Sequence, residues 1–409
     1  MNKIFPLQGI AQNYAWGGTR YIPALIGAAA RPAAGAPVAE WWLGAHPRTP
    51  SRLGMGDAAV PLDRAIAADP VGLLGAAVAR RFGRLPYLFK VLDVERMLSI
   101  QVHPDKGQAE AGFAREAGKP EAERNYRDDN HKPEMAIALS RFHMLHGFRP
   151  LGAICLHLAA YEATRDLAVR VASQGLGQGY AAVMTMPKAE VARRIGAVIA
   201  SVEAWPALDE AVPEYWLLQA AREAGSTADP GLFAFFFLNL AAFEPGQAIY
   251  QPARLPHAYL RGQNVELMAN SDNVLRAGLT PKHVDIPELL SVLEYRESRP
   301  ALYQPTRVGA VINHYPTLCA DFALDDLQFG DDARESLAAT AGPEILFVLD
   351  GQATVQCDHR FQALCRGESL FVAAGTAYRI FGDAGTRLFR VQVGADAAAP
   401  EADHQVATR

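Results

Sequence analysis

The spacing of apolar residues divides the chain into strand-rich and helix-rich stretches. In the first third, short runs of aromatic and β-branched residues, such as residues 87–92, are bounded by Gly or Pro, which is typical of strands joined by turns. Residues 232–243 are the most hydrophobic window and are predicted to form a buried strand. Ala, Leu and Arg dominate three stretches with helical spacing, namely 151–173, 188–205 and 213–224. After about residue 300 the strand pattern returns.

This succession of patterns predicts a mainly β protein with a helical insertion. We expect residues 1–150 and 229–300 to form one strand-rich domain, 151–228 an inserted helical domain, and 301–395 a second strand-rich domain. Residues 396–409 are rich in Ala, Asp and Glu, and are expected to form a flexible tail. Residues 107–130 are Ala-rich and highly charged, which favours a solvated helix or lid-like loop. A surface excursion without a gating role is the alternative for that segment.

Length, charge and cysteine content narrow the class of protein. A chain of 409 residues can form two or three domains with a large core. A formal net charge of −5 argues against a nucleic-acid surface built on positive charge. The four cysteines form no CxxC pair, and no apolar run has the length of a signal peptide or a membrane span. We therefore expect a soluble, cytoplasmic protein with no nucleic-acid or membrane partner. A monomer is a separate expectation that these features do not determine.

Three short segments carry side chains that suit one metal site. Gln101 and His103 are two positions apart, so a strand over residues 98–103 would point both to the same face. Glu134 follows a proline in the second segment, and His257 lies in the third. Two imidazoles, one carboxylate and one amide oxygen can hold zinc and leave a coordination position open.

The segment before His257 resembles the second metal-binding motif of the cupin barrels, because a glycine and a proline precede the histidine at the motif's spacing. A similar frame recurs at residues 367–378, where Tyr378 stands in place of the histidine, and Glu344 matches the end of the first cupin motif. The resemblance implies two cupin-like jelly-roll barrels plus an α-helical domain. The second barrel is expected to be metal-free, so one zinc ion per chain is predicted.

Longer segments resemble the type I mannose-6-phosphate isomerase family. They are residues 12–18, 39–47, 85–92, 98–106, 130–135 and 271–282, in the family's order. The resemblance implies that Gln101, His103, Glu134 and His257 hold the zinc. It also implies that Arg276 is the catalytic arginine. The implied reaction interconverts mannose 6-phosphate and fructose 6-phosphate, and aldose–ketose chemistry of this kind passes through an enediol intermediate.

Other polar residues in these segments are candidates for proton transfer and substrate binding. Lys132 is a candidate acid or base, His131 a candidate for opening the sugar ring, and Glu266 a competing base. The candidate substrate-binding residues, chiefly for the phosphate, are Ser99, Lys106, Asp272 and Lys282. A structural salt bridge from Arg276 to Asp272 or Glu266 is the alternative to its catalytic role. For Trp16, Trp41 and Trp42, packing is favoured over sugar stacking.

Three other functions remain open at this point. The same metal site suits a cupin isomerase or epimerase for another sugar or sugar phosphate. An iron dioxygenase is less favoured, because the glutamine amide would fill a position that oxygen chemistry uses. A non-enzymatic sugar-binding or storage cupin is disfavoured by the complete ligand set and the nearby cationic residues.

Overall fold

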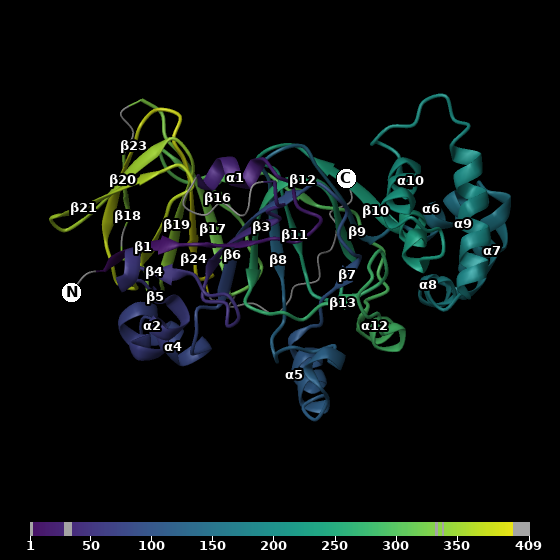
Figure 1. Ribbon diagram of the computed structural model, residues 1–409, viewed down its shortest axis with the longest axis horizontal. Coiled ribbons are helices and arrows are strands. Elements are labelled where there is room, and N and C mark those ends of the chain that lie inside the picture. Colours follow the sequence, from purple (N-terminus) through teal and green to yellow (C-terminus); the bar gives the residue numbers. More distant parts are fainter. Residues whose placement is uncertain (1–2, 28–34, 332–333, 338, 396–409) are drawn as a thin grey trace.

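A computed structural model describes residues 3–27, 35–331, 334–337 and 339–395. Antiparallel sheets fill the centre and one end, and helices of the insertion form the other end (Figure 1). About 31% of the chain is strand and 30% is helix, so the fold is mixed rather than mainly β. The predicted tail at 396–409 lies outside the described residues.

The largest sheet contains strands from both sides of the helical insertion. Its main path runs in the order β14 (Leu302–Tyr303), β11 (Ala248–Gln251), β8 (Glu134–Ala138), β12 (His257–Ala269), β6 (Tyr87–Val94), β3 (Glu40–Gly44) and β2 (Ile10–Gln12). Four more strands belong to it, namely β7 (Gln101–Val102), β9 (Phe142–Phe148), β10 (Leu238–Phe243) and β13 (Leu275–Arg276). The helical insertion therefore separates, along the chain, strands that pair within one sheet. Strand β12, which follows the insertion, pairs with β6 and β8, which precede it.

A second sheet combines both ends of the chain. Its order is β15 (Thr306–Arg307), β16 (Ile312–Tyr315), β17 (Ala323–Gln328), β24 (Arg387–Gln392), β19 (Glu344–Asp350), β22 (Ser369–Val372), β1 (Ile4–Gln8), β4 (Arg52–Leu53) and β5 (Val60–Pro61). A smaller sheet contains β18 (Arg334–Leu337), β23 (Tyr378–Gly382), β20 (Gln352–Cys357) and β21 (Arg360–Cys365). Since β1 pairs with β22, the N-terminal strand joins the C-terminal strands. The predicted division into domains stays a prediction.

The helices of the insertion follow the predicted stretches with one break, and the sequence did not predict α8. They are α6 (Leu151–Ala159), η4 (Glu162–Thr164), α7 (Arg165–Gln174), α8 (Leu176–Met184), α9 (Lys188–Val202) and α10 (Pro213–Ala224). The single helix expected over 151–173 is therefore two helices. The remaining helices are α1 (Tyr21–Ile26), η2 (Gly56–Ala58), α2 (Leu62–Ala68), α3 (Pro70–Leu74), α4 (Ala76–Phe82), α5 (Lys106–Arg115), η3 (Glu121–Glu123) and α12 (Ile286–Val292). Within the described ranges, no helix has the length and apolarity needed to cross a membrane.

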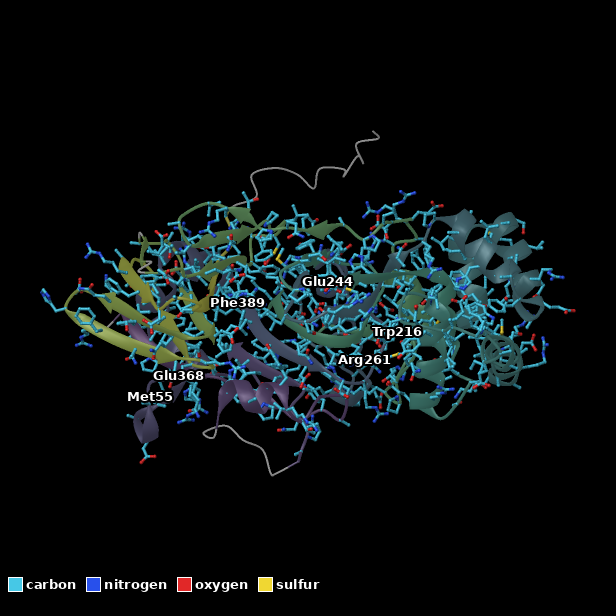
Figure 2. The ribbon with its side chains drawn as sticks, turned by 90° about the horizontal axis from the view of Figure 1, so that it is seen from above. Met55, Trp216, Glu244, Arg261, Glu368 and Phe389 are labelled. Carbon is cyan, nitrogen blue, oxygen red and sulfur yellow. The ribbon has the colours of Figure 1, made fainter. Side chains whose placement is uncertain are left out.

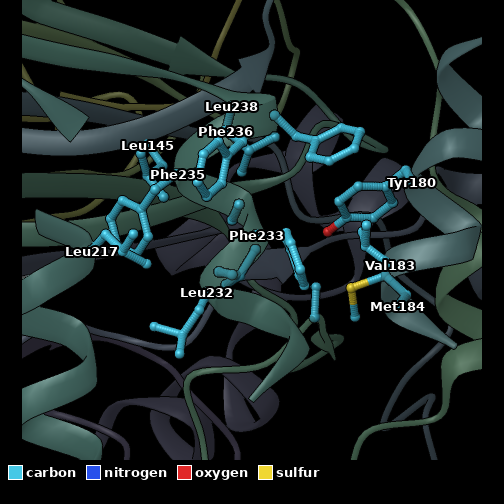
Figure 3. Packing of buried hydrophobic residues seen from close by; sticks show 14 of the residues in the cluster. Leu145, Tyr180, Val183, Met184, Leu217, Leu232, Phe233, Phe235, Phe236 and Leu238 are labelled. Carbon is cyan, nitrogen blue, oxygen red and sulfur yellow. The ribbon is translucent and has the colours of Figure 1, made fainter. Parts of the chain in front are cut away.

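The hydrophobic window at 232–243 is not a single strand. The Asp229 side chain accepts a hydrogen bond from the Gly231 amide at 2.8 Å and begins η5 (Pro230–Phe233), which leads into α11 (Ala234–Phe237) before β10 starts. Its phenylalanines pack with Tyr180 and Leu217 of the insertion (Figure 3). A run that is apolar on all sides suits a buried helix and a buried strand equally, so spacing alone did not separate them.

Aromatic residues also join the two large sheets. The Phe89 ring lies 5.6 Å from the Phe347 ring and 6.1 Å from the Phe389 ring, measured between centroids. Figure 2 places Phe389 among the strands, and Trp216 with Arg261 where the helical end meets the large sheet. The guanidinium of Arg261 lies 5.6 Å from the centre of the Trp216 ring. Side-chain packing therefore holds the largest sheet both against the second sheet and against the helical end.

Strand β12 changes partners midway. Residues His257 to Arg261 pair with β7 and β9, and residues Gly262 to Ala269 pair with β6 and β8. The register shifts between Tyr259 and Arg261, and Gly262 has a φ of 118°. A Cβ at this glycine would lie 2.6 Å from a backbone oxygen. Glycine is therefore required where the strand bends.

We expect Gly262→Ala to lower the free energy of unfolding by at least about 1–3 kcal/mol, because it adds both a strained φ and a backbone clash. Denaturant unfolding measures this loss. Gly196→Ala is the matched control, since a Cβ there meets nothing within 4 Å in helix α9 and should raise stability by up to about 1 kcal/mol. Equal stabilities for the two variants would contradict the prediction.

Candidate metal centre

Three predicted ligands converge on one buried point. His103, Glu134 and His257 each offer a ligand atom within 4.8 Å of the other two, and among the described residues no other group of histidine, cysteine and acidic residues does this. His103 Nε2 lies 3.3 Å from Glu134 Oε1, and His257 Nε2 lies 3.5 Å from Glu134 Oε2. All three side chains are buried. The sequence prediction that these three residues meet is confirmed.

Both imidazoles are oriented for metal binding. His103 Nδ1 lies 2.7 Å from the Asn273 carbonyl oxygen, and His257 Nδ1 lies 3.0 Å from the Leu255 carbonyl oxygen. A carbonyl only accepts, so each Nδ1 carries the hydrogen and each Nε2 keeps its lone pair. Burial lowers the pKa of His103 and lowers that of His257 to about 4, so both rings are neutral near pH 7. These donors fit zinc.

The carboxylate between the imidazoles is ionised. Burial favours a raised pKa for Glu134, but the Lys132 ammonium, and the His103 imidazole once it is protonated at low pH, outweigh burial and hold that pKa well below its usual range. Lys132 is itself buried, and its Nζ lies 2.8 Å from Glu134 Oε1. Lys132 therefore belongs to the centre. His131 points elsewhere, since its Nε2 lies 3.0 Å from Asp321 Oδ2.

Sheet register places Gln101 and Arg276 beside these ligands. Gln101 is directly opposite His257 on one side and Arg276 on the other. Directly opposite residues project to the same face of a sheet. The strand expected over 98–103 is shorter than predicted, because only Gln101 and Val102 pair as β7. Even so, strand pairing places the His257 imidazole, the Gln101 amide and the Arg276 guanidinium in one row across the sheet.

Arg276 has no partner of its own. Its half-buried guanidinium makes no hydrogen bond or ion pair with any described residue, and burial with the nearby charge of Arg127 lowers its pKa. The alternative of a salt bridge to Asp272 or Glu266 is wrong. Asp272 instead lies 2.8 Å from Arg48 and 3.2 Å from His46, and Glu266 pairs with a lysine. Arg276 is thus a free, partly desolvated cation.

The candidate phosphate residues differ in their surroundings. The pKa of Lys282 is lowered by burial and by the charge of Arg276, and its ammonium lies 6.0 Å from the centre of the Tyr14 ring. Lys106 donates to the Asp129 carbonyl at 2.8 Å and also faces an acidic residue one helical turn away. Ser99 is half-buried just before β7. Lys282 is therefore more available to an anion than Lys106.

A buried network that the sequence did not reveal continues from Glu134. Gln251 Nε2 donates to Glu134 Oε2 at 3.3 Å and to the Tyr259 hydroxyl at 2.8 Å, and that hydroxyl donates to Glu266 Oε2 at 2.9 Å. Lys90 Nζ donates to the other oxygen, Glu266 Oε1, at 2.7 Å. The available signal was Lys90 itself, the one charge within the run at residues 87–92, which needs a buried partner.

Two buried tryptophans border this network. Trp42 donates its indole N–H to Glu40, whose carboxylate lies 3.5 Å from Lys90 Nζ. Trp41 lies in the core cluster between the two large sheets. The burial of both side chains favours packing over sugar stacking for these two residues.

The segment at 107–130 is anchored at its C-terminal part. Tyr126 donates to Glu288 at 2.6 Å, and Asn125 donates to Asp285 at 2.8 Å. These contacts tie the chain after α5 to the start of α12. The predicted helix is present as α5, and these contacts favour a fixed surface segment over a lid.

Glu344, which the sequence pattern compared with the first cupin motif, is paired with an arginine. Arg390 Nη2 lies 2.8 Å from Glu344 Oε1, and its Nη1 lies 3.0 Å from Asp325 Oδ2. The Tyr378 hydroxyl donates to the other Glu344 oxygen. All four side chains are buried. A guanidinium therefore neutralises the carboxylate here.

Comparison with known proteins places the chain among isomerases of sugar phosphates. Residues 4–151 match the family described as phosphomannose isomerase type I, catalytic domain. The mannose-6-phosphate isomerase of Escherichia coli is 40% identical over 89% of this chain and 93% of its own length. That of Bos taurus is 35% identical over 91% and 94%. The chain belongs to the mannose-6-phosphate isomerase family.

Solved structures agree with this assignment. The apo form of mannose 6-phosphate isomerase from Salmonella typhimurium has a TM-score of 0.85 and 37% sequence identity, covering 97% of this chain and all of that one. A mannose 6-phosphate isomerase bound with zinc and yttrium has a TM-score of 0.85 and 36% identity, covering 96% of this chain and all of that one. The family resemblance predicted from six segments is confirmed.

We expect Lys90→Met to lower the free energy of unfolding by about 3–5 kcal/mol, because it leaves Glu266 buried without its cation. Adding Glu266→Gln should recover part of this loss, which a double-mutant cycle in denaturant measures. Arg115→Met is the control, since its ion pair with Glu288 is exposed on the arginine side and should contribute at most about 1 kcal/mol. Equal losses for Lys90→Met and Arg115→Met would contradict the prediction.

Proposed function

We propose that the chain interconverts D-mannose 6-phosphate and D-fructose 6-phosphate, with one zinc ion held by Gln101, His103, Glu134 and His257. The observation that carries the proposal is the buried His–Glu–His cluster with both Nε2 atoms free. Gln101 is included because its register sets it opposite His257. Family membership and the zinc-bound relative support the same metal.

The proposed reaction moves a proton between neighbouring carbons through an enediol intermediate. When bound, zinc supplies positive charge beside the sugar oxygens on which negative charge develops. Lys132 is the proposed proton carrier, since its amine is buried next to Glu134. Both oxygens of Glu266 already accept hydrogen bonds, which favours an orienting role for Glu266 over direct proton transfer. Ring opening by His131 stays a prediction, because its ring contacts Asp321.

Arg276 and Lys282 are the proposed cations for the sugar phosphate. Arg276, beside Gln101 in the sheet, acts on the oxygens of the reacting carbons. Lys282 binds the phosphate. Asp272 has a supporting part, since it holds His46 and Arg48. The roles of Ser99 and Lys106 in phosphate binding stay predictions.

The wider arrangement belongs to the same proposal. We infer that the sheets form two cupin-like jelly-roll barrels, of which the second is metal-free, and that the α6–α10 helices form an inserted domain. We also propose a monomeric, cytoplasmic enzyme, and the four free cysteines fit a reducing compartment. The alternative of an isomerase for another sugar phosphate differs only in substrate. A coupled assay comparing mannose 6-phosphate with mannose and other hexose phosphates tests it, and turnover of mannose 6-phosphate slower than of another hexose phosphate would favour the alternative.

We expect Arg276→Ala to keep the zinc content and lower kcat by about 10²–10³, because the guanidinium stabilises charge that develops in the transition state. Arg276→Lys should recover little, since an ammonium lacks the planar fork. Arg96→Ala, an exposed arginine, is the control and should leave kcat unchanged. Steady-state kinetics with zinc analysis tests this. A rise in KM at constant kcat would make Arg276 a substrate clamp instead.

We expect one zinc ion per wild-type chain, and Glu134→Gln to lose both zinc and activity, because the carboxylate alone adds negative charge to the ligand set. Glu344→Gln is the matched variant in the C-terminal region. It should keep one zinc ion and its activity while losing stability, because one of the two buried carboxylates that pair with Arg390 becomes a neutral amide. Elemental analysis of purified protein measures both. Full turnover by metal-free protein, or two tightly held zinc ions per chain, would contradict the prediction.

A further inference from the structure

The carbonyl that orients His103 lies in a buried turn between β12 and β13. His103 follows the end of β7, so strand pairing does not hold its ring. Its Nδ1–H donates to the backbone oxygen of Asn273 at 2.7 Å. Asn273 is fully buried. The position of this one carbonyl therefore decides where the metal-facing Nε2 of His103 points.

The Asn273 side chain fixes that carbonyl against a second segment, residues 127–130. Its Oδ1 accepts from the Arg127 amide at 2.7 Å and from the Asp128 amide at 3.3 Å. Its Nδ2 donates to the carbonyl oxygens of Asp128 at 2.8 Å and Asn130 at 2.9 Å. Acceptor and donors are all used, and each meets a backbone group of the complementary kind. This pairing leaves no other orientation of the amide that satisfies the contacts.

The Asp128 side chain accepts hydrogen bonds from the turn in its own right. Its Oδ2 accepts from the Asp272 amide at 2.7 Å, and its Oδ1 accepts from the Ser271 hydroxyl at 2.8 Å. Asn273 thus reaches from the turn to residues 127–130, and Asp128 reaches from that segment to the turn. We call this reciprocal pair of side chains, Asn273 with Asp128, the clasp.

The clasp joins two parts of the chain that each lead to the metal centre. The turn orients His103 and continues to Arg276, and residues 127–130 continue to Glu134. We propose that Asn273 and Asp128 are positioning residues that preset the metal centre by holding His103 and Glu134 in register. This inference rests on the proposed role of His103 as a zinc ligand.

We expect substitutions in the clasp to change zinc affinity much more than the rate of the chemical step. Residues that orient metal ligands typically contribute 10- to 100-fold in affinity. Asn273→Asp keeps the shape but sets a carboxylate against two carbonyl oxygens. Asp128→Asn sets an amide against the Asp272 N–H. Each should weaken zinc binding by about 10- to 100-fold, while kcat at saturating zinc stays within a few-fold of wild type.

Zinc dissociation constants from chelator competition on the full chain test the proposal, with circular dichroism to monitor folding. Asn125→Asp is the matched control, because Asn125 anchors the same segment to Asp285 outside the clasp and should leave zinc affinity unchanged. If Asn273→Asp and Asp128→Asn unfold, Ser271→Ala should still weaken zinc binding a few-fold. It removes the hydrogen bonds from the Ser271 hydroxyl to Asp128 and Asn130, and the one that this hydroxyl accepts from the Asn273 amide.

Wild-type zinc affinity in folded Asn273→Asp and Asp128→Asn, or in Ser271→Ala, would overturn the proposal. An equal loss in Asn125→Asp would also overturn it, because the effect would then belong to the segment as a whole. If wild-type protein binds zinc through His103 but does not isomerise mannose 6-phosphate, the proposed function fails while the clasp stands. If His103→Ala leaves zinc affinity unchanged, the clasp proposal fails with its ligand.

Discussion

The backbone pairing of β12 is the constraint on which the site depends. This strand hydrogen-bonds to β7 and β9 through its first residues and to β6 and β8 through the rest. His257 begins it, and Glu266 lies directly opposite Lys90. Met268 lies opposite Glu134 on β8. A slip of one residue would turn every one of these side chains to the other face, so register and site are specified together.

Buried charge is the second constraint, because each buried carboxylate in the sheet needs a cation nearby. Glu40, Glu134 and Glu266 carry three formal negative charges, and Lys90 and Lys132 carry two positive ones. The cluster is therefore one charge short of neutral. The zinc ion of the proposed function would make the sum +1, which would favour an anionic state of the sugar over the neutral sugar. Unpaired, any one of these groups would be costly to bury, so the network that supports the reaction also supports the fold.

The sequence predicted those features that a local pattern encodes. Gln101, His103, Glu134 and His257 each lie in a short recognisable segment, and helix α10 was predicted at its full length. Helix α11 was missed because an all-apolar run has no period that separates helix from strand. The Lys90–Glu266 pair and the clasp depend on contacts between segments more than 100 residues apart. No local pattern contains such contacts, so they become visible only when the strands are aligned.

Glu134 and Glu344 show two ways to bury a carboxylate in similar surroundings. Around Glu134, two imidazoles present lone pairs, and a cation bound there keeps a position open to a further ligand. Around Glu344, the Arg390 guanidinium and the Tyr378 hydroxyl use both oxygens, so every contact is satisfied within the chain. The second arrangement contributes stability and specificity of packing, and it has no site at which a substrate oxygen can bind. In the proposed function, chemistry belongs to the first arrangement, because a bound metal ion would supply the positive charge that Arg390 supplies in the second.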